Sequence, residues 1–196
     1  MLVSRTLSFL AALMLALTAV NAVAETDWDP VGGSGNAAFE DRCPPGQWLV
    51  AIQGRAGAWV NRVQIACTAV SGSGPLPRHL SMRTNLWIGP PRGGSGGGVT
   101  GGACNGVIRG IWPHMTPGNR QVKYIDLWCK NAFGGPGATG RFNTFTNPGQ
   151  DVNGGSNQPI QMMCPDQDAA VGLRGRYGAD VNAISLICVP FDPEMR

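Results

Sequence analysis

The sequence predicts an all-β fold in which three antiparallel sheets pack around one pseudo-threefold axis. The first observation is a period: six cysteines mark three repeats, whose leading cysteines stand 61 and 60 residues apart. The second is composition, because only 14% of the 196 residues are charged and 29 are glycine, which favours strands and tight turns over surface helices. The third is an alternation of apolar residues before the second cysteine of each repeat.

Each repeat opens with a glycine turn and continues into a hairpin. The turns are Gly32-Gly33-Ser34, Gly93-Gly94-Ser95 and Gly154-Gly155-Ser156. The second hairpin strand places apolar residues on one face, in the triplets Val63/Ile65/Cys67, Ile125/Leu127/Cys129 and Ile184/Leu186/Cys188. These faces are expected to point toward the shared axis.

The remaining strands are predicted from shorter signals. Apolar runs at Leu49–Gln53 and Ala169–Arg174 form first hairpin strands, joined to the second strands through Gly54–Gly57 and Gly175–Gly178. Further strands are expected at Phe39–Asp41, Arg83–Trp87 and Arg141–Phe145. Four strands in each of three repeats give about twelve strands.

The first 24 residues predict a secretory signal peptide. Arg5 supplies a positive charge, Leu7–Val20 is an apolar segment too short to span a membrane comfortably, and Ala22-Val23-Ala24 is an A-x-A cleavage site. Cleavage after Ala24 leaves 196 − 24 = 172 residues with no second long apolar run, so we expect no membrane span in the mature chain. The prediction is a secreted or periplasmic protein with one domain over residues 25–196, in repeats of about 25–70, 80–130 and 140–190.

Charge and motif patterns exclude several functions. Removal of Arg5 leaves 14 basic and 12 acidic residues, a net charge of +2, and the arginines are scattered singly. Nucleic-acid binding needs a clustered basic field, so no nucleic-acid partner is expected. No Ser/His/acid set or paired carboxylates stand out, and Gly93–Gly102 lacks the Lys-Ser/Thr ending of a phosphate-binding loop. We therefore expect neither catalysis nor a cofactor.

The six cysteines are interpreted as three disulfides, because an even number in an exported chain favours oxidation. Pairing within repeats, across each hairpin, gives separations of 24, 25 and 24 for Cys43–Cys67, Cys104–Cys129 and Cys164–Cys188. Zinc is the alternative. It normally requires C-x-x-C knuckles, which are absent, and His79 and His114 lie 35 residues apart, so no metal site is predicted.

The middle repeat is longer than the other two. From Gly110 to Cys129 there are 19 positions, against 13 from Gly54 to Cys67 and from Gly175 to Cys188. The extra segment, Trp112–Asn119, is interpreted as a surface loop, since loops accept insertions at little cost. A dedicated binding loop is the alternative.

At this point the chain resembles a known family. Gly32-Gly33-Ser34-Gly35 with the following Phe39-Glu40-Asp41, and the segment Gly172–Ile184, are similar to the opening glycine loop and closing hairpin of jacalin-related lectins. The resemblance covers all three repeats. It implies a β-prism I fold of three four-stranded antiparallel Greek-key sheets, an architecture also used by the egg vitelline membrane outer layer protein.

The resemblance also implies where a sugar would bind. In that family the sugar lies between a glycine loop and a G-x-x-x-D loop of the preceding repeat, and glycine allows close approach to the ring. The first implied site places Gly33, Ser34 and Gly35 opposite Gly178, Ala179, Asp180, Val181 and Asn182. The second places Gly94, Ser95 and Gly96 opposite Gly57, Ala58, Trp59, Val60 and Asn61.

Both sites depart from the family pattern at one position. Asn182 and Asn61 stand where the family's sugar binders hold aspartate, and the third site has Lys123 there. Asparagine keeps hydrogen-bonding capacity but loses charge assistance. Asp180 and Trp59 are expected to compensate by hydrogen bonding or stacking. Alternatively, Trp59 packs on a neighbouring strand and the asparagines cap turns.

Two functions follow from these residues. The first is a secreted jacalin-like, lectin-like carbohydrate-binding protein without catalytic activity, whose partner is a glycan or polysaccharide. The alternative is a disulfide-stapled structural or protein-interaction β-prism that binds no sugar. The two differ in one geometric expectation: a sugar site requires the glycine loops and the asparagine loops to converge within hydrogen-bond reach.

Overall fold

The computed structural model describes residues 25–73, 79–82, 85–104, 106–130, 139–145 and 159–191. Within these ranges the chain forms strands and no helix, which confirms the predicted all-β class. The predicted signal peptide and the third glycine turn, Gly154-Gly155-Ser156, lie outside the described residues.

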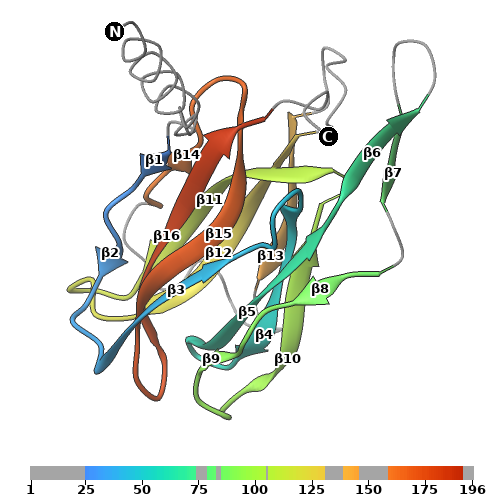
Figure 1. The fold of residues 1–196 in the computed structure, drawn as a ribbon. Coiled ribbons are helices and arrows are strands. Elements are labelled where there is room, and N and C mark those ends of the chain that lie inside the picture. Colours follow the sequence, from blue (N-terminus) through green and yellow to red (C-terminus); the bar gives the residue numbers. More distant parts are fainter. Residues whose placement is uncertain are drawn as a thin grey trace, which may run out of the picture.

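Three sheets with one shared strand order form the molecule (Figure 1). Sheet 1 has the order β1-β16-β15-β3, with β2 also paired to β16: β1 Thr26–Asp27, β2 Val31–Gly32, β3 Ala37–Arg42, β15 Asp168–Tyr177 and β16 Val181–Pro190. Sheet 2 has the order β8-β5-β4-β10, with β9 also paired to β5: β4 Trp48–Ala56, β5 Val60–Thr68, β8 Trp87–Ile88, β9 Arg92–Gly93 and β10 Gly98–Ala103. Sheet 3 has the order β13-β12-β11-β14: β11 Val107–Met115, β12 Val122–Lys130, β13 Thr139–Phe145 and β14 Met162–Met163.

The prediction of four strands per sheet holds for sheet 3, whereas sheets 1 and 2 have five. The difference lies at one edge, where β1 and β2 share the partner β16, and β8 and β9 share the partner β5. Pro30 separates the first pair, and Pro90 and Pro91 separate the second. Proline cannot donate to a strand ladder, so each edge strand is divided into two short pieces.

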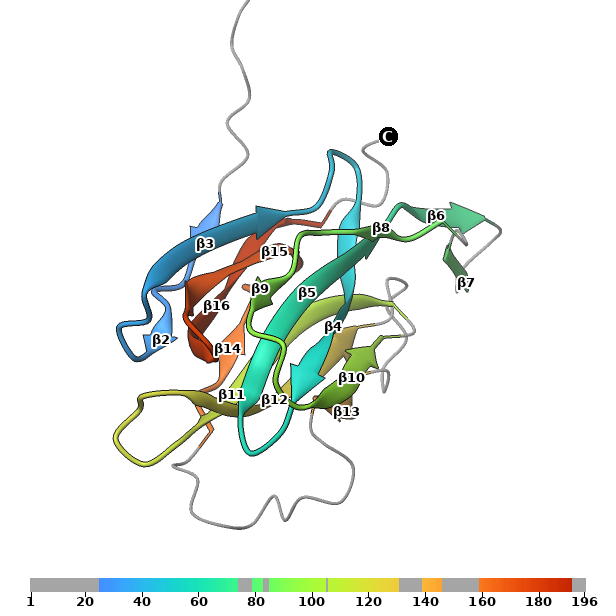
Figure 2. The ribbon, with the colours of Figure 1, turned by 90° about the horizontal axis from the view of Figure 1, so that it is seen from below.

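Sheets combine strands from neighbouring repeats. In sheet 1 the opening strands β1, β2 and β3 pair with the closing hairpin β15–β16, so the two ends of the described chain meet in one sheet (Figure 2). Likewise β10, which follows the second glycine turn, completes the sheet of the first hairpin, β4–β5. The first and second glycine turns therefore each lie beside a hairpin of the repeat that precedes them around the axis.

Several local predictions need correction. The hairpin strands β4 and β15 run through Gly54 and Gly175, so the turns begin later, at Gly57 and Gly178. In the predicted strand at Arg83–Trp87, residues 83 and 84 lie outside the described ranges, Asn85 and Leu86 are not in a strand, and Trp87 begins β8. An unpredicted hairpin joins β6 (Val70–Ser73) to β7 (His79–Met82). The strands at Phe39–Asp41 and Arg141–Phe145 are confirmed as parts of β3 and β13.

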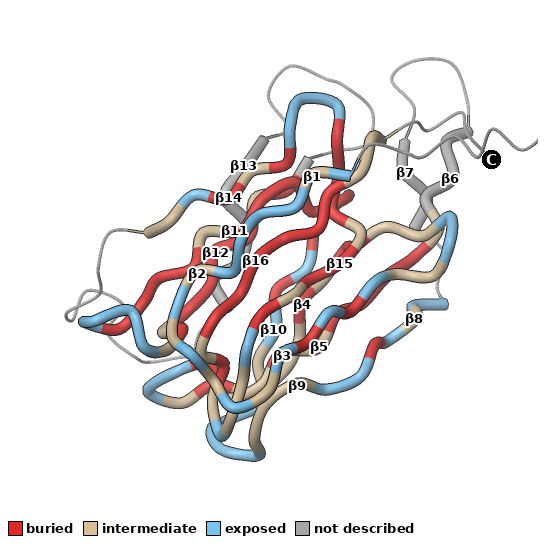
Figure 3. Tube along the Cα trace, turned by 60° about the vertical axis from the view of Figure 1, so that its left-hand side comes forward, coloured by how far each residue is buried: buried red, intermediate tan, exposed pale blue. Residues whose placement is uncertain are grey.

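The core fills the space between the sheets, and its buried residues lie along the central strands (Figure 3). All three predicted apolar triplets are buried, with exposed fractions of 4% or less, which confirms the inward phase of the second hairpin strands. Ile52, Ile111 and Leu173 from the first hairpin strands join them, each fully buried. Burial of such side chains stabilises the fold by roughly 1.5–3 kcal/mol each.

The three predicted disulfides are present, as Cys43–Cys67, Cys104–Cys129 and Cys164–Cys188. They do not cross a hairpin as expected. Cys43 follows β3 and its amide donates to Val171 of sheet 1, whereas Cys67 lies in β5 of sheet 2. The other two follow the same rule, because Cys104 and Cys164 donate to β4 and β11, while Cys129 and Cys188 lie in β12 and β16. Each disulfide therefore joins two sheets, and the three close a ring around the axis.

The first half of the extra segment in the middle repeat is part of a strand. Trp112–Met115 belongs to β11, and Pro113, His114 and Met115 are buried, so the expected surface loop over Trp112–Asn119 is wrong for its first half. The connection between β11 and β12 spans residues 116–121, six residues, against three in 57–59 and 178–180. The insertion is thus three residues long. Counting from Gly110 overestimated it because Gly110 pairs with Trp128 and is not equivalent to Gly54, which pairs with Val63.

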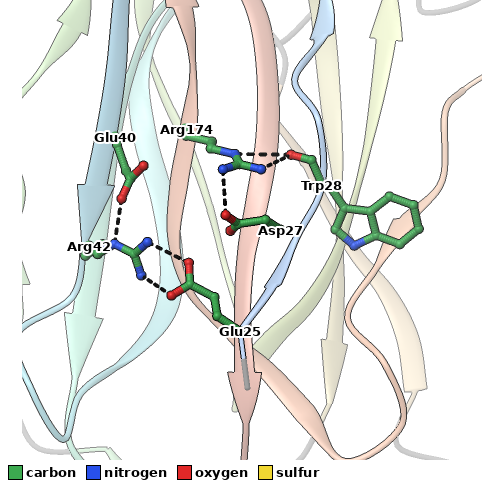
Figure 4. A network of polar contacts seen from close by, with 6 residues as sticks. All are labelled: Glu25, Asp27, Trp28, Glu40, Arg42 and Arg174. Atoms are coloured by element: carbon green, nitrogen blue, oxygen red, sulfur yellow. Dashed lines mark hydrogen bonds and ion pairs between the residues drawn. The ribbon is translucent and has the colours of Figure 1, made fainter. Parts of the chain in front are cut away.

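Ion pairs hold the first strand on sheet 1 (Figure 4). Arg42 donates from Nη2 to Glu25 at 2.6 Å and from Nε to Glu40 at 2.7 Å. Arg174 donates from Nη1 to Asp27 at 2.8 Å. The hydrogen bond from Arg42 lowers the pKa of Glu25, and the same bond raises the pKa of Arg42.

Candidate functional site

Three hairpin ends and two glycine loops gather at the lower end of the molecule as drawn in Figure 1. We call these hairpin ends tip 1 (residues 178–180), tip 2 (57–59) and tip 3 (116–121) of sheets 1, 2 and 3. In each tip the first amide donates to the last carbonyl at 2.9 Å: Gly178 to Asp180, Gly57 to Trp59 and Thr116 to Gln121. Asp180, Trp59 and Gln121 therefore occupy equivalent positions.

Site 1 is formed where the first glycine loop meets tip 1. The amide of Gly33 donates to the carbonyl of Asn182 at 2.9 Å, and Arg176 Nη2 donates to the carbonyl of Gly35 at 3.1 Å. A Cβ on Gly33 would lie 2.5 Å from the carbonyl oxygen of Arg120, so only glycine allows tip 3 to approach this closely. A polar depression of about 620 Å³ results, lined by Gly32–Asn36, Gly118–Gln121, Gly178–Asp180 and Asn182.

Site 2 repeats this arrangement on sheet 2. The amide of Gly94 donates to the carbonyl of Asn61 at 2.8 Å, and Arg55 Nη2 donates to the carbonyl of Gly97 at 2.6 Å. A Cβ on Gly94 would lie 2.5 Å from the carbonyl oxygen of Ala179. Each glycine loop therefore lies between the tip of its own sheet and the tip of a neighbouring sheet.

The sequence-predicted residues take different positions within these sites. Ser34, Ser95 and Ala179 are exposed, and the ring of Trp59 is 38% exposed on tip 2. Val181 and Val60 are fully buried, backbone included, so neither residue is open to a ligand in this structure. The loops carrying Gly33 and Asn182, and those carrying Gly94 and Asn61, meet within hydrogen-bond reach.

The asparagine side chains connect neighbouring sheets. Asn182 Nδ2 donates to the carbonyl of Arg120 in tip 3 at 3.2 Å, and Asn61 Nδ2 donates to Asp180 Oδ1 in tip 1 at 2.6 Å. A Cβ on Gly35 would lie 2.6 Å from Asn182 Oδ1, and one on Gly97 would lie 2.5 Å from Asn61 Oδ1. In both sites the amide nitrogen thus points to the next tip and the amide oxygen points to the glycine loop.

Sequence reasoning favoured a surface loop over Trp112–Asn119 and kept a binding loop only as the alternative. Gly118–Gln121 line site 1, and the first two of these residues belong to that segment. Arg55 and Arg176 were missed, although a recurring signal was available, because each stands two residues before the first glycine of its tip. The signal for tip 3 was obscured by counting the insertion from a residue that is not equivalent.

A buried ion pair anchors the second glycine loop. Arg92 in β9 donates from Nε to Asp41 in β3 at 2.8 Å, and the side chain of Asp41 is only 4% exposed. Hydrogen bonding to Asp41 raises the pKa of Arg92. The pair connects sheets 1 and 2 directly beside Gly93, where that loop begins.

Within the described ranges, no group of three histidine, cysteine or acidic side chains is placed to hold a metal ion. A search of the same residues for a helix long and apolar enough to cross a membrane finds none.

The chain is similar in structure to several solved lectins. They include a mannose binding jacalin related lectin from Ananas comosus (14% identity, TM-score 0.52, 86% of this chain and 99% of that chain). A second is Calystegia sepium agglutinin, with 16% identity and a TM-score of 0.51 over 85% of this chain and 95% of that chain. A third is frutapin, a lectin from Artocarpus incisa, with 11% identity and a TM-score of 0.53 over 85% of this chain and 97% of that chain. The chain therefore has the jacalin-like β-prism fold. The likeness to the vitelline membrane outer layer protein stays a prediction.

No family model matches the sequence, and no curated protein is significantly similar to it.

Proposed function

We propose that this chain is an exported carbohydrate-binding protein without catalytic activity, which binds glycans at sites 1 and 2. The observation that carries the proposal is the convergence of each glycine loop with an asparagine loop, through the bonds Gly33 to Asn182 at 2.9 Å and Gly94 to Asn61 at 2.8 Å. Both loops expose polar groups at one end of the molecule, and site 1 is an open depression large enough for a sugar ring.

The chemistry of site 1 fits a polyhydroxylated ligand. Sugars are bound by backbone and amide groups that donate and accept at close range, and glycine permits that approach. Besides glycines, its lining includes the polar residues Ser34, Asn36, Asn119, Arg120, Gln121, Asp180 and Asn182. Mannose is the first sugar to test, because it is what the Ananas comosus protein of the same fold binds.

Glycine substitutions at equivalent positions test the proposal. Gly33→Ala and Gly94→Ala each place a Cβ 2.5 Å from a carbonyl of the neighbouring tip, at sites 1 and 2 respectively. Each is expected to displace that tip and lower affinity at its own site at least tenfold. The measurement is calorimetric titration of wild type and variants with methyl α-mannoside and with a mannose oligosaccharide.

Gly46→Ala provides the control, because Gly46 lies between β3 and β4, outside both sites, and its Cβ would meet no atom within 4 Å. Its affinity should equal that of the wild type. Equal binding by wild type, Gly33→Ala and Gly94→Ala would place the sugar elsewhere and overturn both sites.

The structural alternative has one observation in its favour. Both asparagine amides already donate within the protein, to Arg120 and Asp180, as bonds that hold neighbouring sheets together would. If the wild type binds no sugar and the glycine variants only lower stability, the loops are structural and the alternative replaces the proposal.

A further inference from the structure

Asp180 contacts groups of both candidate sites. Its Oδ1 accepts from Asn61 Nδ2 at 2.6 Å, and its Oδ2 accepts from Gln121 Nε2 at 2.7 Å. Asn61 belongs to site 2, whereas Gln121 lines site 1. The three residues come from three sheets, so one carboxylate joins all three tips.

The bond to Asp180 fixes the orientation of the Asn61 amide. An amide has a donor end and an acceptor end, and a carboxylate only accepts. Nδ2 must therefore face Asp180, which turns Oδ1 toward the second glycine loop, against Gly97. Asn61 Oδ1 is buried and has no hydrogen-bond partner in the structure. The acceptor that an aspartate would provide at this position is thus kept by an asparagine, oriented by a carboxylate from another sheet.

Site 1 is connected to the same carboxylate by one more step. The bond between Asp180 and Gln121 holds tip 3 against tip 1. The neighbouring carbonyl, that of Arg120, accepts from Asn182 Nδ2 at 3.2 Å. Hydrogen bonds to a charged group are roughly twice as strong as neutral ones, so the two bonds of Asp180 are the strongest connections in this chain of contacts.

We propose that Asp180 is a positioning residue that orients Asn61 directly and Asn182 through tip 3, so that one carboxylate sets the affinity of both sites. The proposal rests on the proposed function. Asp180 lines site 1, whereas it reaches site 2 only through the amide of Asn61, which its carboxylate holds. Loss of Asp180 is therefore expected to weaken site 2 as well, although Asp180 does not line it.

An NMR titration resolves the two sites. The backbone amides of Gly33 and Gly35 report on site 1 and those of Gly94 and Gly96 on site 2, with methyl α-mannoside and a mannose oligosaccharide as probes. Asp180→Asn preserves size but removes the charge, and we expect Kd to rise about tenfold at both sites, given the strength of charged hydrogen bonds. Asp29→Asn, an exposed carboxylate between β1 and β2, makes the same charge change and should alter neither.

Gln121→Leu distinguishes the two hydrogen bonds of Asp180, the one to Asn61 and the one to Gln121. It removes the bond between Asp180 and tip 3 together with an amide that lines site 1, so it should weaken site 1 and leave site 2 unchanged. A loss confined to Gly33 and Gly35 in Asp180→Asn would make Asp180 a direct sugar ligand of site 1 and overturn the proposal. Unchanged affinity at both sites would overturn it as well.

Hydrogen exchange of the side-chain amides gives a readout without sugar. In the wild type, the NH₂ groups of Asn61 and Gln121 should exchange slowly, and both should exchange faster in Asp180→Asn but not in Asp29→Asn. If no sugar shifts any signal of the wild type, the proposed function fails. The amide exchange then decides alone whether Asp180 holds the two side chains, and equal exchange in wild type and Asp180→Asn overturns that role too.

Discussion

Two neighbouring residues of β16 separate stability from binding. Ile184 is fully buried in the core, whereas Asn182 lies at the strand's start, where its side chain donates to Arg120. The pairing of β15 with β16 skips Asn182, so this residue is the extra residue of a β-bulge and is not carried into the core with Ile184. The first reaches the rim and the second reaches the core.

Alanine substitutions should therefore have unequal costs. Ile184→Ala removes buried apolar volume and should lower the free energy of unfolding by about 2–5 kcal/mol. Asn182→Ala loses one partly exposed hydrogen bond, with an expected cost of about 1 kcal/mol. Denaturant melts of both variants give the comparison. Equal losses would make Asn182 a structural residue and support the alternative function.

At the scale of elements, β1 depends on charge more than on backbone pairing. It contributes only Thr26 and Asp27 to sheet 1, and the contacts beside it are the ion pairs of Arg42 and Arg174 (Figure 4). Two residues of strand provide little pairing, so the ion pairs are expected to decide whether β1 stays attached.

The lowered pKa of Glu25 gives this attachment a pH dependence. Hydrogen bonding to Arg42 holds that pKa below the ordinary value of 4.5, so the ionised form favours the folded arrangement. Its stabilisation is present above that value and is lost as the pH falls through the lowered folded pKa. Hydrogen-exchange protection of Thr26 and Asp27, relative to the centre of β16, should decrease on acidification.

Glu25→Gln is the control for this effect. It removes the titrating group, so the protection of β1 should be lower than in the wild type at neutral pH and should change little on acidification. If wild type and Glu25→Gln lose protection equally as the pH falls, another group is responsible for the attachment.

For the whole molecule, periodicity predicted more than local pattern did. The cysteine period predicted three equivalent sheets, and the alternation at Ile184, Leu186 and Cys188 predicted which face is buried; both are confirmed. The disulfide pairs were also predicted, but their path was not, because spacing says which cysteines belong together and nothing about which sheets they join. The division of two edge strands was not predicted, because the effect of Pro30, Pro90 and Pro91 on strand pairing was not considered.

The candidate sites were predictable only where a motif repeats. Glycine loops and hairpin ends recur in the sequence, so their meeting at Asn61 and Asn182 could be expected from the resemblance. Tip 3 at site 1, and the bonds of Asp180 to Asn61 and Gln121, arise between residues 59 and 119 positions apart, on different sheets. Such contacts depend on how sheets pack, which no local pattern encodes.

A glycan array tests the central claim most directly, namely that the glycine-loop end of this prism binds sugar. The oxidised protein would be applied to a broad panel that includes mannose-rich and complex oligosaccharides, alongside the double variant Gly33→Ala/Gly94→Ala. We predict reproducible binding of the wild type to a related group of glycans, and loss of that binding in the double variant. Absence of wild-type binding across the panel, or equal binding by the double variant, would contradict the account.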